Sequence, residues 1–215
     1  MKETIYSIPI NESFEITDGA CPVCRLHDRL LEDTLEYTLG AAMMESDVRQ
    51  RTNTQGFCPG HLSMLLTRQK KLPLALVLQT HLDELRGNKK ILFDVSDCYV
   101  CNRVGGFLQA YYSNILYLWR TESGFARKWD AQNFICRPHM AGLAAAAPRG
   151  LSKKEAAAFM ENLTAKAKAQ LSALSESLGI FIRSFDHRFA KEPLGGHKEA
   201  IQNAARFLGT EGERE

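Results

Sequence analysis

Hydrophobic side chains recur at helical spacing through most of this chain. From Cys24 to about Met44 one face of the pattern is apolar or small, comprising Leu31, Leu35, Thr38, Leu39 and Ala42. A broader apolar face follows later in the chain, formed by Val104, Phe107, Leu108, Tyr111, Tyr112, Ile115, Leu116 and Trp119. Spacing of three to four residues is typical of amphipathic helices. The width of the second face predicts a helix buried against more than one neighbour.

Helix boundaries are marked by proline, glycine and capping residues. Pro59 and Pro138 each suit the first turn of a helix, and Pro73 restarts a helix that Gly87 ends near Leu85. Ser152 and Glu155 have capping-box spacing for a long helix toward Leu178, which we expect to continue through Phe189. A last short helix is predicted over 197–208, ending at Gly209.

Two kinds of segment depart from the helical pattern. Residues 4–17 alternate apolar and polar positions around Pro9, which favours a strand or an extended arm. Segments 45–57 and 122–135 are expected to be connectors, the first of them polar with one helical turn at most. The predicted fold class is therefore mostly α: duplicated helical repeats that bind metal, followed by a long C-terminal helix and a short final helix.

The cysteines reveal an internal duplication. Two C-x-x-C pairs and two C-x-x-H pairs alternate along the chain, with the ligands Cys21, Cys24, Cys58, His61, Cys98, Cys101, Cys136 and His139. The first pairs are 77 residues apart and the second pairs 78, and Leu31/Leu108, Leu39/Leu116, Gln55/Gln132 and Phe57/Phe134 keep the 77-residue offset. We infer repeats at about 20–70 and 97–147 and a helical segment at 151–209, together forming a single domain over 1–215.

Three cysteines and one histidine make a complete ligand set for tetrahedral zinc. All six cysteines belong to the two sets, so two zinc ions per chain are predicted. Because each C-x-x-C or C-x-x-H pair precedes a predicted helix, the positive helix end would favour the thiolates. An iron–sulfur cluster is the alternative cofactor, and thioredoxin-like redox dithiols are disfavoured because no βαβ pattern surrounds them.

Similar spacing within each repeat favours sites that close locally. A helix of about 20 residues would travel roughly 30 Å, and an extended connector would return to the starting point. The metal ion would then clamp that returning connector. Pairing across the repeats, for example Cys21 and Cys24 with Cys136 and His139, is the open alternative.

Composition and charge limit the class of protein and its cellular compartment, but they do not identify a partner. The 215 residues are 45% hydrophobic and 24% charged, as in ordinary globular proteins. Net charge is +2, with an acidic stretch over 1–50 and a basic stretch over 51–150 that we expect to neutralise each other. The alternative is that the basic stretch favours an acidic partner. Nothing strongly indicates nucleic acid, and the sequence leaves open whether a small molecule binds. Neither a signal peptide nor a membrane span is expected, so reduced thiols in the cytoplasm favour metal or redox chemistry.

No catalytic constellation accompanies the predicted sites. Four protein ligands occupy all coordination positions of each predicted zinc ion, whereas a catalytic zinc keeps one position for water. His27 and His81 are interpreted as solvated helix positions, with support of the nearby Cys24 ligand as the alternative for His27. Phosphate-binding and nucleophile-elbow motifs are missing. The leading hypothesis is a non-catalytic binding or adaptor module with a protein partner. Its rivals are a redox or metal sensor and an iron–sulfur electron-transfer protein.

One further segment, 185–193, mixes aromatic and charged residues. We expect Phe185 and Phe189 to dock on the core while Asp186 and Arg188 remain in solvent. The alternative is a binding surface for an anion or a partner.

Four motifs carry a resemblance to a known family. They are CPVCR at 21–25, GFCPGHL at 56–62, YLWRTE at 117–122 and FDHRFAKEP at 185–193. The chain resembles, over nearly its whole length, the prokaryotic Domain of Unknown Function 6062 family, whose hallmark residues match the eight ligands above. Family members often carry tryptophan after the late proline, where this chain has Leu194. The resemblance implies one architecture along the chain and supplies no chemistry.

Overall fold

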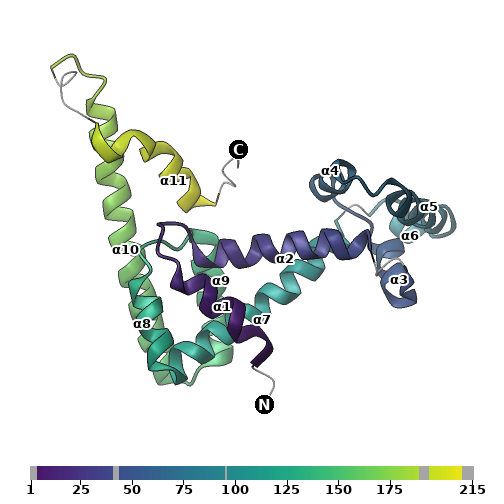
Figure 1. Cartoon of the computed structure of the whole chain (residues 1–215), viewed down its shortest axis with the longest axis horizontal. Coiled ribbons are helices and arrows are strands. Elements are labelled where there is room, and N and C mark those ends of the chain that lie inside the picture. Colours follow the sequence, from purple (N-terminus) through teal and green to yellow (C-terminus); the bar gives the residue numbers. More distant parts are fainter. Residues whose placement is uncertain (1–3, 41–43, 95, 189–193, 210–215) are drawn as a thin grey trace. The chain divides into compact units, whose positions relative to one another are not determined.

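The computed structural model describes residues 4–40, 44–94, 96–188 and 194–209, and this part of the chain is helical without strands (Figure 1). The elements are α1 (Thr4–Glu15), α2 (Pro22–Thr38), α3 (Ser46–Gln55), α4 (Pro59–Thr67), α5 (Lys71–Gly87), α6 (Lys89–Leu92), α7 (Tyr99–Thr121), α8 (Ser123–Ala131), α9 (Arg137–Gly150), α10 (Lys153–Arg183), the 3-10 helix η2 (Gly195–Glu199) and α11 (Ala200–Leu208). The mostly α class with a long C-terminal helix is confirmed. Within the described residues, no helix combines the length and apolar character needed to cross a bilayer.

The chain divides into two compact units that do not coincide with the two repeats. Unit 1 comprises Met1–Leu26 and Gln109–Glu215, and unit 2 comprises His27–Leu108. Each unit therefore takes residues from both repeats, and α2 and α7 contribute residues to both units. The single domain over 1–215 stays a prediction.

An aromatic core holds unit 1 together. The rings of Phe14 and Phe125 lie 5.0 Å apart, and Trp129 lies 5.2 Å from Phe159, so α1, α8 and α10 share one cluster. Trp129 is fully buried, and its indole N–H donates to Asn162 Oδ1 at 2.8 Å. Burying several aromatic side chains with a satisfied polar handle anchors the long helix α10 against α8. Helices α9 and α11 also pack on α10.

The prediction of an extended arm at 4–17 is wrong, because these residues form α1. Ile10 and Phe14, four residues apart, are both buried, whereas Ile8 is 64% exposed. Packing of this stripe against α8 outweighs the cost of Pro9 inside the helix. The end of the segment is held by Arg25, whose guanidinium donates to the carbonyls of Ser13 and Ile16 at 3.0 Å.

The two expected connectors are also helical. Residues 46–55 form α3, whose buried Val48 and Thr52 face α5 in unit 2. Residues 123–131 form α8, whose buried Phe125 and Trp129 face the core of unit 1. Both stripes are only two side chains long, which is too short a pattern to separate a helix from a loop in the sequence alone.

Several predicted boundaries are confirmed. Pro59 lies in the first turn of α4 and Pro138 in that of α9. Ser152 and Glu155 form both bonds of a capping box at the start of α10, and Gly209 ends α11 with φ of 101°. The long helix stops at Arg183 instead of continuing through Phe189.

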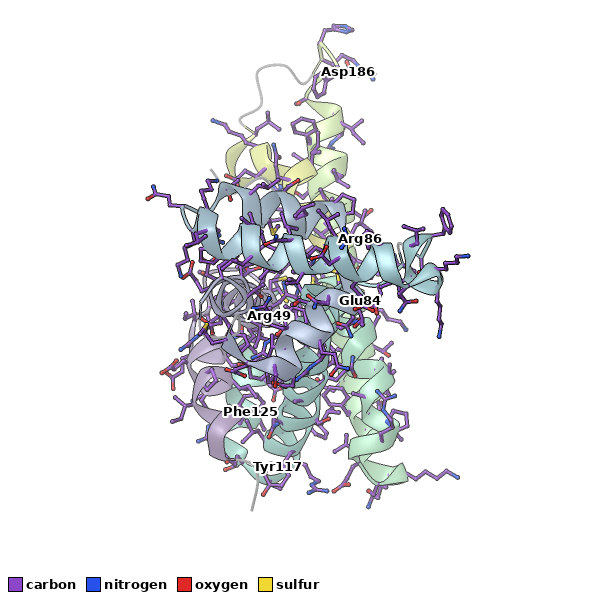
Figure 2. The ribbon with its side chains drawn as sticks, turned by 90° about the vertical axis from the view of Figure 1, so that its right-hand side faces the viewer. Arg49, Glu84, Arg86, Tyr117, Phe125 and Asp186 are labelled. Atoms are coloured by element: carbon purple, nitrogen blue, oxygen red, sulfur yellow. The ribbon has the colours of Figure 1, made fainter. Side chains whose placement is uncertain are left out.

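The predicted docking of Phe185 on the core is wrong. Phe185 is 78% exposed just after α10, and its ring contacts only Phe181 among the described aromatic rings, at 5.3 Å. Asp186 beside it is paired with Arg188 at 2.6 Å and lies beyond the end of α10 (Figure 2). Phe189 lies outside the described residues.

Candidate metal centres

The eight predicted ligands gather into two clusters of three cysteines and one histidine. Site A, within unit 1, consists of Cys21, Cys24, Cys136 and His139. Site B, within unit 2, consists of Cys58, His61, Cys98 and Cys101. Each site takes its C-x-x-C pair from one repeat and its C-x-x-H pair from the other. The prediction of local closure is therefore wrong, and the pairing is crossed.

The predicted local closure assumed an extended connector, whereas much of the connector is helical. Such a connector has to return along α2, which at 17 residues spans about 25 Å. The ten residues of α3 rise only about 15 Å, so they cover less of that distance than an extended segment would. In the structure the C-x-x-H pair meets the C-x-x-C pair of the other repeat.

Every ligand pair lies at a helix N-terminus. Cys58 and Cys136 are the N-cap residues of α4 and α9, which places His61 and His139 in the first turn. Cys21 and Cys98 directly precede α2 and α7, and their carbonyls accept from the N–H groups of Arg25 and Asn102. Unpaired backbone N–H groups and the positive helix end favour thiolate at these positions. Each site is thus a meeting of two helix starts.

The spacing of the donor atoms fits one tetrahedral ion. Zinc bound to sulfur at about 2.3 Å and nitrogen at about 2.0 Å sets S···S edges of about 3.8 Å and S···N edges of about 3.5 Å. The Sγ atoms of Cys24 and Cys136 are 3.6 Å apart, and those of Cys58 and Cys101 are 3.9 Å apart. Distances from the cysteine Sγ atoms to His Nδ1 are 3.0–3.6 Å in site A and 3.2–3.5 Å in site B. The cysteines are free, and a disulfide would bring two sulfurs to about 2.05 Å.

Electrostatics inside the clusters favours a bound cation. Hydrogen bonds of the Cys24 thiol to the Cys136 and Cys21 sulfurs raise the pKa of Cys24, and burial and the negative charge of those sulfurs add to the effect. Burial opposes a charged imidazolium at His139, yet hydrogen bonds and charge from Cys136 and Cys21 raise its pKa to about 9. In site B the backbone N–H of His61 lowers the pKa of Cys58. A divalent cation between such thiolates offsets their mutual repulsion.

Site A is enclosed by a side chain outside the ligand set. Tyr112 of α7 is only 3% exposed, and its ring lies 6.4 Å from that of His139. The tyrosine fits because α9 carries Gly142, where an added Cβ would lie 2.3 Å from Tyr112 Cζ. Burial raises the pKa of Tyr112, and the site A thiolates add to the effect. None of the four site A ligands is exposed.

Site B is supported by His81, which is not one of its ligands, and part of the site is exposed to solvent. His81 Nδ1 donates to the Asn53 carbonyl at 2.6 Å, and its ring packs on Gly56, where φ is 61°. Gly56 in turn accepts from the Tyr99 N–H at 3.0 Å, which joins the two ligand segments. The interpretation of His81 as a solvated residue is wrong, because it is half-buried in this contact. Cys101 is exposed, unlike any site A ligand.

Sequence reasoning missed the side chains that hold the segment leading to Cys136. Lys166 and Gln170 of α10 reach this segment from one helix face: Lys166 Nζ donates to the Asp130 and Gln132 carbonyls, and Gln170 Nε2 donates to the Asn133 carbonyl at 2.9 Å. From the other side, Gln132 Nε2 donates to the Phe14 carbonyl at 2.8 Å. The i, i+4 spacing of Lys166 and Gln170 was visible in the sequence. The carbonyls that they contact lie more than 30 residues away, so the contacts could not be predicted.

The fold and these centres define an all-helical protein with two Cys3His clusters that can hold metal ions. The chain belongs to the Family of unknown function DUF6062, whose model matches residues 1–95 and 87–215. The resemblance seen in the motifs is thereby confirmed, and the two matches fit the duplication. A similar protein is the "Uncharacterized 23.9 kDa protein in xynA 3'region" of Caldicellulosiruptor sp. (strain Rt8B.4), 23% identical over 167 residues, covering 74% of this chain and 82% of that protein. No solved structure matches the chain.

Proposed function

We propose that sites A and B each hold one zinc ion in a structural role. The observation that carries this proposal is that four protein donors surround each centre at tetrahedral spacing. No ligand position is left for water or substrate, as a catalytic zinc would require. Each ion would join two helix starts that are far apart in sequence.

Donor spacing favours a single ion over an iron–sulfur cluster. A cluster inserts several irons and sulfides between its thiolates, which pushes some ligands further apart than ligands of one ion. All four donor atoms of each site lie within 4.8 Å of one another. Three thiolates with one imidazole are also a ligand set that zinc commonly takes.

Metal analysis of anaerobically purified protein tests the assignment. We expect about two zinc ions per chain and a colourless sample, because zinc has no visible absorption. Cys58→Ser and Cys136→Ser should each remove about one equivalent, from different sites. A brown sample with iron and sulfide, or two equivalents retained in both variants, would contradict the proposal.

We further propose that the zinc-stabilised helices serve as a non-catalytic, cytoplasmic binding module for a protein partner. The supporting observation is the exposed end of α10, where Ile182 is 67% and Phe185 78% exposed. Neighbouring large apolar side chains left in water are typical of protein contacts. The Asp186–Arg188 pair lies beside them and would form a polar rim.

A matched pair of variants tests the partner role. A tagged full-length chain should retain a stoichiometric partner that Phe185→Ala loses and Leu171→Ala keeps. Leu171 is a suitable control because it is 52% exposed on the same helix α10. Equal capture by both variants would remove this surface from the proposal, and a wild-type chain that never captures a protein would refute the adaptor role.

A redox or metal sensor is the second candidate, supported by the exposure of Cys101. An accessible thiolate is attacked first by oxidants, and its loss opens the coordination sphere. About one equivalent of peroxide per chain should then release zinc from site B first, up to about one ion per chain, with Cys101 modified before Cys21 or Cys136 in mass spectra. Simultaneous release of both ions, or modification of site A first, would argue against a sensor at site B.

A further inference from the structure

The last turn of α11 contacts residues on both sides of Cys136 in the sequence. The ring of Phe207 lies 6.3 Å from that of Phe134, two residues before Cys136, in an edge-on contact. Gly209 packs on Pro138, two residues after Cys136, so closely that an added Cβ would lie 2.5 Å from Pro138 Cγ. Phe207 is only 4% exposed. The end of α11 therefore rests on the C-x-x-H segment of site A.

The two ends of the helical segment 195–209 are held by different parts of unit 1. At its start, η2 packs on α10, where His197 Nδ1 and Ser177 Oγ share a hydrogen bond of 3.0 Å. At its end, Phe207 and Gly209 meet the segment that carries Cys136. Packing on α10 is shared by η2 and α11, whereas the contact with site A is made by the last turn. A change at site A should therefore act on this turn first.

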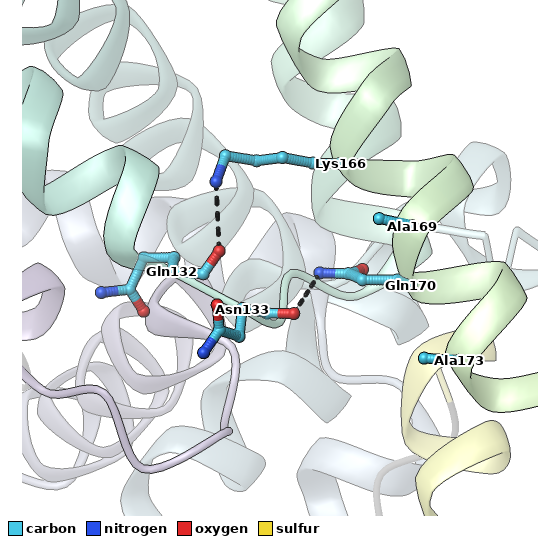
Figure 3. Close-up of a pocket in the computed structure, with 6 residues that line it drawn as sticks. All are labelled: Gln132, Asn133, Lys166, Ala169, Gln170 and Ala173. Carbon is cyan, nitrogen blue, oxygen red and sulfur yellow. Dashed lines mark hydrogen bonds between the residues drawn. The ribbon is translucent and has the colours of Figure 1, made fainter. Parts of the chain in front are cut away.

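The position of the C-x-x-H segment depends on the state of site A. Residues 132–136 connect α8 to α9 without helical structure, and side chains of α10 hold this connector at the Gln132 and Asn133 carbonyls (Figure 3). Closer to the site, Cys136 Sγ lies 3.6 Å from Cys24 Sγ. A bound cation joins these two sulfurs, whereas thiolates without a cation repel each other. Loss of the ion would thus loosen the connector at its ligand end.

We propose that zinc at site A controls the docking of the last turn of α11, an inference that rests on the zinc ion proposed for this site. With the ion bound, the C-x-x-H segment is fixed and α11 stays docked on it. Without the ion, the last turn detaches and uncovers Phe134 and Phe207. Newly exposed aromatic side chains change the surface that the protein offers to a partner. Because coupling between two sites is reciprocal, weaker docking of α11 also weakens zinc binding at site A.

Hydrogen exchange on the full-length chain tests this coupling. Cys21→Ser removes a site A ligand that lies outside the C-x-x-H segment, and Cys98→Ser removes the equivalent ligand of site B. Amides in the last turn of α11 should exchange about tenfold faster in Cys21→Ser and at the wild-type rate in Cys98→Ser. Wild-type protein treated with a zinc chelator should behave as Cys21→Ser does, and added zinc should restore the protection.

Zinc content and the α10 amides, measured on the same samples, separate the outcomes. Unchanged exchange of α11 in Cys21→Ser, despite the loss of about one zinc ion, would overturn the coupling. Equal acceleration along α10 would show general unfolding and would contradict a coupling confined to α11. A wild-type chain that contains no zinc would instead refute the metal sites, and the coupling with them.

Variants of α11 test the same coupling in the reverse direction. Phe207→Ala removes the packing on Phe134, and Leu208→Ala alters the next residue, which is 60% exposed. Zinc affinity at site A should fall about tenfold in Phe207→Ala and stay within about twofold of the wild type in Leu208→Ala. Site B should bind zinc equally well in both variants. Wild-type affinity at site A in Phe207→Ala would overturn the coupling and leave the zinc assignment intact.

Discussion

Sites A and B have the same ligands and the same helix-start geometry, yet their surroundings differ. Site A is closed by Tyr112, which occupies the space that Gly142 leaves. At the equivalent positions, 77 and 78 residues earlier, unit 2 has Leu35 and Met64. Site B instead exposes Cys101 and is supported through backbone contacts at Gly56. Duplication has kept the coordination chemistry while the packing diverged, so the two sites should differ in stability and not in metal preference.

Removing one ligand from each site gives the largest expected contrast. Cys136→Ser should abolish zinc at site A and lower the free energy of unfolding by about 4 kcal/mol, because buried thiolates are left without a cation. Cys101→Ser should abolish or weaken zinc at site B and cost about half as much, since water can reach the position. Chemical denaturation with metal analysis compares them, and a larger loss in Cys101→Ser would reverse the ranking.

A methyl group at Gly142 tests whether the enclosure of site A is tight. Gly142→Ala should destabilise the protein by about 1–3 kcal/mol, because the new Cβ would overlap the Tyr112 ring. Gly179→Ala in α10 is the control, since its Cβ meets nothing within 4 Å. That substitution should instead stabilise by about 0.5–1 kcal/mol through helix propensity. Thermal unfolding of the two variants should move in opposite directions; two parallel shifts would speak against a packed site A.

Removing the contacts of Lys166 with the segment that leads to Cys136 should affect site A alone. Lys166→Met removes the donors to the Asp130 and Gln132 carbonyls, and we expect about tenfold weaker zinc binding at site A. Lys168→Met, on an exposed position of the same helix, is the matched control. Competition with a coloured chelator resolves the two sites by affinity. Equal zinc release by both variants would show that the Lys166 contacts do not support the metal centre.

Substitution of His81, which supports site B, should have the smallest effect on zinc binding. His81→Ala removes the bond to the Asn53 carbonyl and the packing on Gly56, so a severalfold loss of zinc affinity at site B is expected. Leu82→Ala alters the next residue, which is 63% exposed, and should leave both sites unchanged. Weaker binding at site A in His81→Ala would show that the effect is general destabilisation.

The sequence was most informative where chemistry repeats and where caps are local. The 77-residue offset identified all eight ligands, and Pro59, Pro138, Ser152 and Glu155 predicted helix starts that the structure confirms. These signals depend on neighbours within a few residues, so they need no knowledge of the tertiary structure.

The crossed ligand pairing and the short helices could not be predicted from the sequence, for a physical reason. Equal spacing makes local and crossed sites look alike in the sequence, and the helical state of α3 was not predicted. That state depends on Val48 packing against α5, just as α1 depends on Phe14 packing against α8. Exposure of Phe185 was likewise invisible, because its aromatic neighbours suggested a core position. Tertiary contacts override weak local patterns in each case.

The crossed pairing also sets the order in which the two metal centres can be completed during synthesis of the chain. Site B unites segments about 40 residues apart, and this loop lies inside the one that site A closes across more than 110 residues. Closing the longer loop costs about 1 kcal/mol more chain entropy. A chain emerging from the ribosome carries every ligand of site B once Cys101 is made, whereas site A waits for His139. Metal acquisition would therefore proceed from the inner loop outward, and synthesis halted between Cys101 and Cys136 would leave site B complete and site A with half its ligands.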